Sequence, residues 1–167
     1  APNVTYNQDT GIVTLAETYN TSRDWTDTST FTNVTNGPES FYAIFDGDLD
    51  TGAFNGDPDA ASVTFGTPVA STSSVELYVN PGSSENAYIS INGGTQVPIT
   101  GSGNWYTAAT GTNTVNSVQW NDPNGMKLRA VKIDGKILVN SDAFNTSQNW
   151  SSSVTSDTSV VNPANGF

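Results

Sequence analysis

Short runs in which apolar and polar residues alternate, each ended by a turn sequence, restrict this chain to a structure built of strands. Residues 75–79 alternate and end at Asn80-Pro81-Gly82, and the apolar runs 128–133 and 136–139 flank Asp134-Gly135. A period of two places every second side chain on the same face of a sheet. Asp-Gly between two such runs is the strongest short-range signal of a β-hairpin. No window shows apolar residues sustained at helical spacing.

The remaining runs extend this pattern along most of the chain. Residues 88–91 and 96–99 flank Asn92-Gly93-Gly94 and predict a tight hairpin. Pro98 predicts that the second of these strands lies at a sheet edge, because proline cannot donate a ladder hydrogen bond. Eight or more strands and no long helix predict an all-β fold, specifically an antiparallel β-sandwich of the jelly-roll type. The further strands are predicted at residues 12–15, 41–45, 62–65, 105–108 and 115–120.

A long-range repeat suggests how the chain is organised. The segment Tyr19-Asn20-Thr21-Ser22 with Trp25 returns 125 positions later as Phe144-Asn145-Thr146-Ser147 with Trp150, and Asp9 and Ile12 match Asp134 and Ile137 in the same register. Self-similarity at a fixed period is typical of repeat proteins, here with a period as long as a domain. The repeat predicts that residues 1–18 are the end of a preceding repeat or an N-terminal strand. It also predicts that residues 19–143 form a complete β-sandwich module and that residues 144–167 begin a following repeat.

Charge and composition exclude several classes of function. The chain carries 16 acidic and 5 basic residues, a net charge of −11 that would repel nucleic acid. No apolar run is long enough for membrane insertion. The chain lacks His and Cys, which excludes Ser-His-Asp and Cys-His catalysis and ordinary zinc sites. An enzyme would have to use carboxylates alone, as in a glycosidase using Glu76 or Glu85 with Asp residues, so we expect a protein that is not an enzyme.

An acidic loop is a candidate calcium site. Asp46, Asp48 and Asp50 alternate around Gly47, and Asp57 follows. Calcium takes six to eight oxygen ligands, which a loop of alternating carboxylates can supply. The alternative is that these residues only initiate turns and keep the surface soluble.

Aromatic residues offer a candidate ligand site. Trp105 and Tyr106, next to Asn104, could stack a sugar ring and hydrogen-bond its hydroxyls, because this segment is typical of a loop. The alternative is that the aromatic residues form the sandwich core. Trp25 and Trp150 are equivalent under the repeat, which favours a structural role for both.

Four of the five basic residues lie on the predicted closing hairpin. They could form a positive seam that contacts an acidic neighbour, either the loop 46–59 or a next module. Alternatively they could be charges on an edge strand that discourage aggregation. These four residues are Lys127, Arg129, Lys132 and Lys136.

Taken together, three motifs resemble a module repeated in very large virion proteins of marine phages, notably cyanophages. They are the opening Asn-Thr-Ser-X-X-Trp at residues 20–25, Ala-Ile-Phe-Asp-Gly-Asp at residues 43–48, and the closing hairpin at residues 128–139. The resemblance implies a non-catalytic structural, tail-fibre or adhesion module, extracellular or in the virion, which contacts neighbouring repeats, virion proteins or the host surface.

The segment Phe45-Asp46-Gly47-Asp48 also looks like the calcium-side loop of galactose-binding-like (discoidin) sandwiches. The Trp that those domains usually carry shortly afterwards is replaced near Ala53-Phe54. This departure argues against sugar binding at that loop. The aromatic residues Trp105 and Tyr106 favour the alternative hypothesis, a carbohydrate-binding module of a secreted or surface protein with a cell-surface glycan as its partner. A carboxylate-based glycosidase is a third hypothesis.

Overall fold

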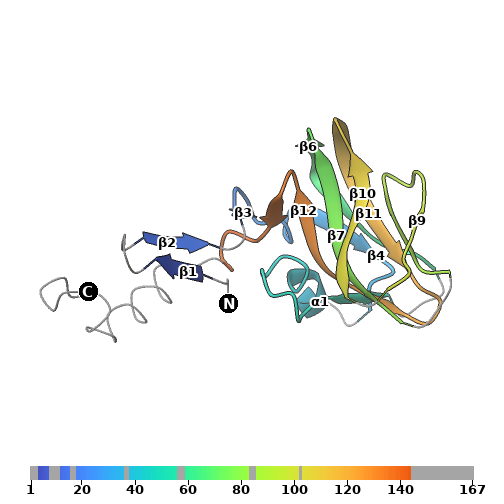
Figure 1. Ribbon diagram of the computed structural model, residues 1–167. Helices are drawn as coiled ribbons and strands as arrows, with labels where there is room; N and C mark the ends of the chain where they lie inside the picture. The colour runs from blue at the N-terminus through green and yellow to red at the C-terminus, as the bar shows by residue number, and fades with distance from the viewer. Residues whose placement is uncertain are drawn as a thin grey trace, which may run out of the picture.

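The computed structural model describes residues 4–7, 12–15, 18–35, 38–55, 59–82, 86–101 and 103–143. They form a two-sheet sandwich and a separate two-stranded hairpin, β1 (Val4–Asn7) with β2 (Ile12–Leu15) (Figure 1). The strands of the sandwich are β3 (Thr18–Asn20), β4 (Ser29–Thr32), β5 (Ala53–Asn55), β6 (Ala61–Ser71), β7 (Ser74–Pro81), β8 (Tyr88–Ile91), β9 (Val97–Pro98), β10 (Asn104–Thr110), β11 (Asn113–Asn121), β12 (Met126–Ile133) and β13 (Lys136–Leu138).

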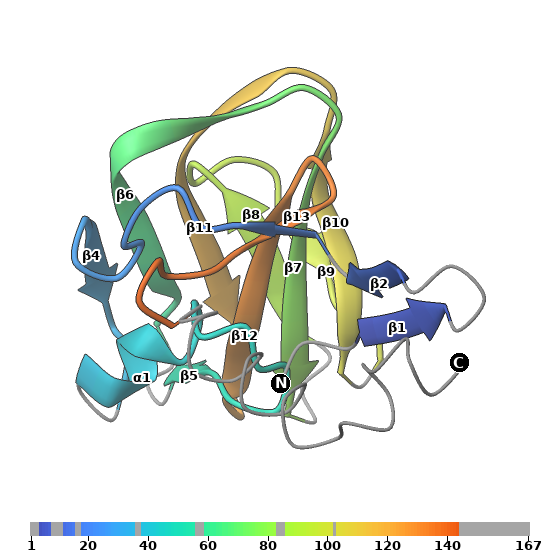
Figure 2. The ribbon, with the colours of Figure 1, turned by 90° about the vertical axis from the view of Figure 1, so that its left-hand side faces the viewer.

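The two sheets confirm the predicted β-sandwich. One has the order β10-β7-β12-β13-β3, with β5 also paired to β12, and the other has the order β4-β6-β11-β8-β9. Figure 2 shows β12 and β7 of the first sheet in front of β11 and β8 of the second. All pairs are antiparallel except β13 with β3, which run parallel. Within the described part of the chain, no helix is long and apolar enough to cross a membrane.

The core lies between the sheets and follows the alternation of the sequence. On β7, Val75, Leu77 and Val79 are fully buried, because a period of two points all three toward the opposite sheet. Trp25 is also buried, with its ring centroid 6.5 Å from that of Phe45. Trp25 is therefore a core residue, as the repeat predicts.

The two predicted hairpin features are confirmed. Asp134 and Gly135 have φ values of 51° and 75°, and positive φ at both central residues is typical of a type I′ turn. Pro98 lies on β9 at the edge of the second sheet. An edge strand tolerates proline because its outer side has no neighbouring strand that needs the missing N–H.

The predicted strand at residues 41–45 is wrong. The helix α1 (Pro38–Tyr42) and a turn occupy this segment. Proline favours the first helical turn because its φ is already helical and its missing N–H would be unpaired there. The apolar residues instead fill the end of the core: Phe41 stacks on Phe31 at 4.2 Å, and Ile44 and Phe45 are fully buried.

The first and last segments of the sandwich are joined by a buried amide. Asn140 is fully buried, and its Oδ1 accepts hydrogen bonds from the backbone N–H groups of Trp25 and Thr26 at 2.8 and 3.1 Å. Its Nδ2 donates to Thr26 Oγ1 at 2.7 Å, and its backbone N–H donates to the Phe45 carbonyl, also at 2.7 Å. The entry to the core and the exit from the last strand are thus fixed at one side chain.

A second polar anchor ties the closing hairpin to the β6–β7 turn. The carboxylate of Asp134 accepts hydrogen bonds from the backbone N–H groups of Thr72, Ser73 and Ser74, with a shortest distance of 2.8 Å from Ser73. The Ser73 N–H in particular holds the pKa of the Asp134 carboxyl well below its usual range, because these bonds favour the ionised form. β6 and β7 belong to different sheets, so this carboxylate helps to fix one sheet on the other.

We expect Asp134→Asn to lower the free energy of unfolding at pH 7 by about 1–3 kcal/mol, because the turn N–H groups lose a charged acceptor. The contribution of Asp134 is fully present above its unfolded pKa of about 4 and is lost as the pH falls through the lower folded value. Chemical denaturation at pH 7 and pH 3 should show a smaller pH dependence for the variant than for the wild type. Asp59→Asn, at an exposed carboxylate, is the control; an equal effect of both substitutions would contradict the assignment.

Candidate functional site

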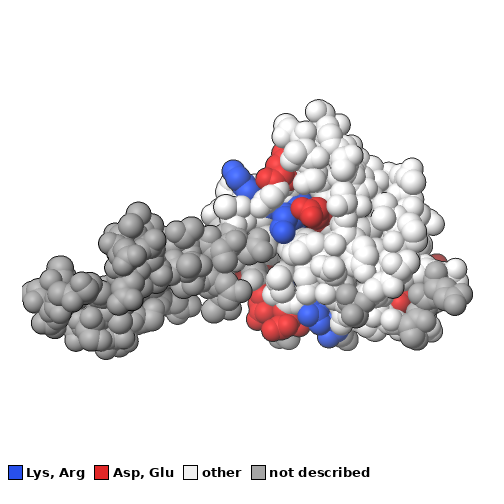
Figure 3. Space-filling model, viewed as in Figure 1, with Lys and Arg blue, Asp and Glu red and all other residues white. Residues whose placement is uncertain are grey.

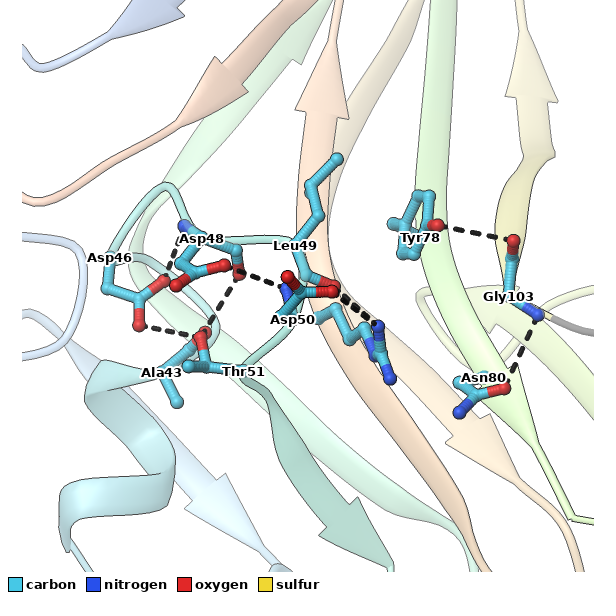
Figure 4. Close-up of polar contacts among 10 residues, drawn as sticks. Ala43, Asp46, Asp48, Leu49, Asp50, Thr51, Tyr78, Asn80 and Gly103 are labelled. Carbon is cyan, nitrogen blue, oxygen red and sulfur yellow. Dashed lines mark hydrogen bonds and ion pairs between the residues drawn. The ribbon is translucent and has the colours of Figure 1, made fainter. Parts of the chain in front are cut away.

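A partly exposed aromatic pair lies on the outer face of the first sheet. Trp105 on β10 and Tyr78 on β7 are directly opposite in register, and their ring centroids are 5.3 Å apart at an interplanar angle of 78°. The Tyr78 hydroxyl donates to the Gly103 carbonyl at 3.2 Å (Figure 4). Edge-to-face packing and this hydrogen bond hold the rings in place.

A cation lies over the Trp105 ring. Lys132 Nζ is 3.9 Å from the ring centroid. The register of β12 against β7 shifts between Leu128 and Ala130, so that Leu128 stays in the core while Ala130 and Lys132 belong to the outer face. The ammonium group is attracted to the negative face of the indole, so one face of Trp105 already contacts a polar group.

Polar groups surround this pair. Asn80 Oδ1 accepts from the Gly103 N–H at 3.3 Å, and Asn104 Oδ1 accepts from the Trp105 N–H at 2.8 Å. Glu76 pairs with Thr107, two positions along the strands from the pair of Tyr78 and Trp105. A spacing of two residues places both pairs on the same outer face. An aromatic surface with polar groups at its border is typical of small-ligand recognition.

The structure separates two of the predicted ligand residues. Trp105 and Tyr106 lie on the strand β10, not on a loop, so their side chains point to opposite faces. Tyr106 packs against the main core, whereas Trp105 joins the outer apolar cluster with Tyr78. Tyr78 could have been found in the sequence as an outward position of the run 75–79, but its contact with Trp105 depends on the pairing of β10 with β7.

The predicted calcium residues form a chain of turns. Asp46 Oδ1 accepts from the Asp48 N–H at 2.8 Å, and Asp48 Oδ1 accepts from the Asp50 N–H at 2.9 Å (Figure 4). Asp46 Oδ2 accepts from the Thr51 hydroxyl at 2.7 Å. Each bond of a carboxylate to the backbone two residues on is an Asx-type turn, as the turn hypothesis expects. Burial raises the pKa of Asp46 above its usual range.

Calcium binding by this loop stays a prediction. In the described ranges no group of three or more acidic side chains is arranged so that it could hold a metal ion. Asp57 lies outside the described residues, as does Glu85, one of the predicted glycosidase carboxylates. The acidic loop therefore offers oxygen atoms, but the described side chains use several of them within the loop itself.

The closing hairpin contacts the acidic loop through Arg129. Its Nη1 donates to the Leu49 carbonyl at 2.6 Å and lies 3.7 Å from Asp50 Oδ1. Figure 3 shows acidic atoms grouped near α1 and the following loop, and basic and acidic atoms side by side over β12 and β7. The interpretation of these basic residues as charges on an edge strand is wrong, because β12 and β13 lie between β7 and β3.

Comparisons with known proteins give weak structural similarities only. No protein-family model and no curated protein matches the chain. The module CBM32-1 of a family 31 glycoside hydrolase from Clostridium perfringens matches with 16% identity and a TM-score of 0.45, over 66% of this chain and 96% of that chain. A chitosan-binding module of a chitosanase/glucanase from Paenibacillus sp. IK-5 matches with 17% identity and a TM-score of 0.43, over 65% and 94%. The family 32 carbohydrate-binding module of Clostridium perfringens NanJ, solved with galactose, matches with 17% identity and a TM-score of 0.37, over 65% and 96%. These similarities are too low to assign the chain to a family.

If calcium binds the loop, it should raise the melting temperature and a chelator should lower it, because a ligand bound only by the native state stabilises that state. A free calcium concentration of about 100 times the dissociation constant corresponds to ~2.7 kcal/mol. Calorimetry with calcium, magnesium and EDTA measures this shift. Asp48→Asn should reduce it and Asp27→Asn, at another carboxylate, should not. A melting temperature that is the same in calcium and in EDTA would eliminate the site.

Proposed function

We propose that this chain contains a non-catalytic β-sandwich module that binds carbohydrate on the outer face of its first sheet. The observation that carries the proposal is the partly exposed Trp105, held edge-to-face by Tyr78 on a rigid sheet. The apolar face of a sugar ring stacks on an aromatic ring of this kind, while the sugar hydroxyls need hydrogen-bonding groups around it. Trp105 packs against the outer apolar cluster of Ala130, Ile137 and Val139 and is still partly exposed, so part of its ring is open to such a ligand.

The neighbours of Trp105 support a sugar as its ligand. Thr107 is exposed, and Glu76 and Lys132 are half-buried at the same part of the face. Asn104 is exposed too, but it pairs with the core residue Val79 in the register and so belongs to the other face of β10. Together Thr107, Glu76 and Lys132 provide donors and acceptors with both signs of charge, which suits neutral hydroxyls better than an extended anion. Lys132 is flexible, so its ammonium group can move from the indole to a hydroxyl or a carboxylate of the ligand.

An extracellular or cell-surface setting is part of this proposal, since exposed glycans are found there. The virion or tail-fibre setting implied by the sequence resemblance stays a prediction: none of the three solved structures named above is described as a virion protein. A glycan-binding module would serve an adhesion fibre as well as a secreted protein, so the setting does not alter the proposed site.

We expect the wild-type chain to bind at least one class of glycan on an array, and Trp105→Ala to weaken that binding at least about tenfold, or ~1.4 kcal/mol. Trp105→Tyr should retain part of the affinity, because it keeps an aromatic face. Titration calorimetry with the best glycan measures both variants.

The control for this experiment is Thr114→Ala, at an exposed position of the opposite sheet. It should bind like the wild type. A wild-type chain that binds no glycan, or a Trp105→Ala variant that folds and keeps full affinity, would overturn the proposed function.

A further inference from the structure

The hairpin β1–β2 lies outside the sandwich and resembles the closing hairpin β12–β13. It forms its own two-stranded sheet (Figure 1). In β1–β2, Asn7 pairs with Ile12. The residues 125 positions later, Lys132 and Ile137, pair in the same way in the closing hairpin β12–β13. The same spacing relates the segments beginning at Tyr19 and Phe144. The two hairpins therefore agree in strand pairing as well as in sequence.

The surroundings of the two hairpins differ. β12 is flanked by β7 and β13, and β13 by β3, so the closing hairpin is inside a sheet. The described part of the chain gives β1 and β2 no such neighbouring strand. A two-stranded hairpin by itself is at best marginally stable in water. The strands β1 and β2 are therefore paired like the closing hairpin β12–β13, but in the described residues they do not belong to a larger sheet.

We infer that this chain is a section of a tandem array, and that β1–β2 is the closing hairpin of a preceding module. One full module then corresponds to residues 19–143, with β3 beginning one residue earlier, at Thr18. The segment from Phe144 to Trp150 then corresponds in sequence to the opening segment 19–25 and belongs to a following module. The partner of each module is thus a second copy of itself in the same chain.

The first copy shows what the second copy requires. The Asn20 carbonyl accepts hydrogen bonds from the Val139 N–H at 3.0 Å and from Trp25 Nε1 at 3.1 Å. Asn140 binds the backbone of Trp25 at 2.8 Å. The opening segment of a module is therefore held by the closing strand of the same module, about 120 residues later. By the same rule, the segment that contains Asn145 and Trp150 needs the closing strand of the module that follows.

The geometry of the joint follows from the parallel pairing of β3 with β13. The chain enters β3 beside the closing turn, where the Thr18 hydroxyl donates to the Gly135 carbonyl at 2.7 Å. It leaves β13 at the other end of these strands, where the Asn140 N–H binds the Phe45 carbonyl beside the acidic loop. Only residues 16 and 17 separate β2 from β3. Successive modules are therefore joined end to end through very short connectors.

The two ends of the module differ in charge. The exit end carries Asp46, Asp48 and Asp50, with Arg129 against Asp50 and the exposed Asp142 nearby. The entry end carries the exposed Lys136 in the same hairpin as the carboxylate of Asp134. A short connector brings the acidic exit end of one module close to the entry end of the next. Contacts of this kind favour a defined orientation and weaken with salt.

The repeat supplies a matched pair of variants for the test. In the full chain, Trp25→Ala should lower the melting temperature by about 10 °C or more, because it removes a buried indole. In a polypeptide of residues 1–167, Trp150→Ala should leave it unchanged, because that polypeptide holds no second copy of residues 43–125 for Trp150 to pack against. If Trp25→Ala does not fold, Trp25→Phe against Trp150→Phe gives the same comparison. Equal losses from the two positions would overturn the proposal.

A longer chain tests the same inference in the opposite direction. A copy of residues 43–143 added after Phe167 completes the second module, because Phe167 aligns with Tyr42. Trp150→Ala should now destabilise one of two unfolding transitions, and the transition of the first module should stay in place. An added segment that remains unfolded, measured by hydrogen exchange, would contradict the array. Neither experiment measures glycan binding. The proposed array and the proposed glycan site can therefore be contradicted separately.

Discussion

The buried amide of Asn140 is the contact on which closure of the sandwich depends. It binds the backbone where the chain first enters the core, at Trp25 and Thr26, although it lies more than a hundred residues further along the chain. A buried amide that lost these partners would leave polar groups unpaired, which costs more than a hydrogen bond contributes when made. The position of Trp25, and with it the packing against Phe45 and Phe65, follows from this contact.

The local features of the fold could be predicted from the sequence, because they depend on neighbouring residues. Asp134-Gly135 specifies its turn through positive φ, and Pro98 specifies an edge through its missing donor. The segment 41–45 could not be predicted in this way. Five apolar residues fit a buried strand and a buried turn equally well. The turn is held in part by the stacking of Phe41 on Phe31, a contact between separate segments that the local sequence does not reveal.

The candidate site was predictable only in part for the same reason. An exposed role for Trp105 could be proposed from its surroundings in the sequence, but Tyr78 and Lys132 reach it through strand pairing. Lys132 in particular depends on the shift in register between Leu128 and Ala130. A regular strand would place Leu128 and Ala130 on one face, whereas the shift directs them to opposite faces. Nothing in the local sequence marks this irregularity.

The parallel pairing of β3 with β13 also determines how the sandwich carries a mechanical load. Thr18 lies opposite Lys136 and Asn20 opposite Leu138, so both strands point the same way. Tension that pulls the chain before Thr18 in one direction and the chain after Leu138 in the other acts along the strands. The backbone bonds between them are then sheared together instead of being opened one at a time.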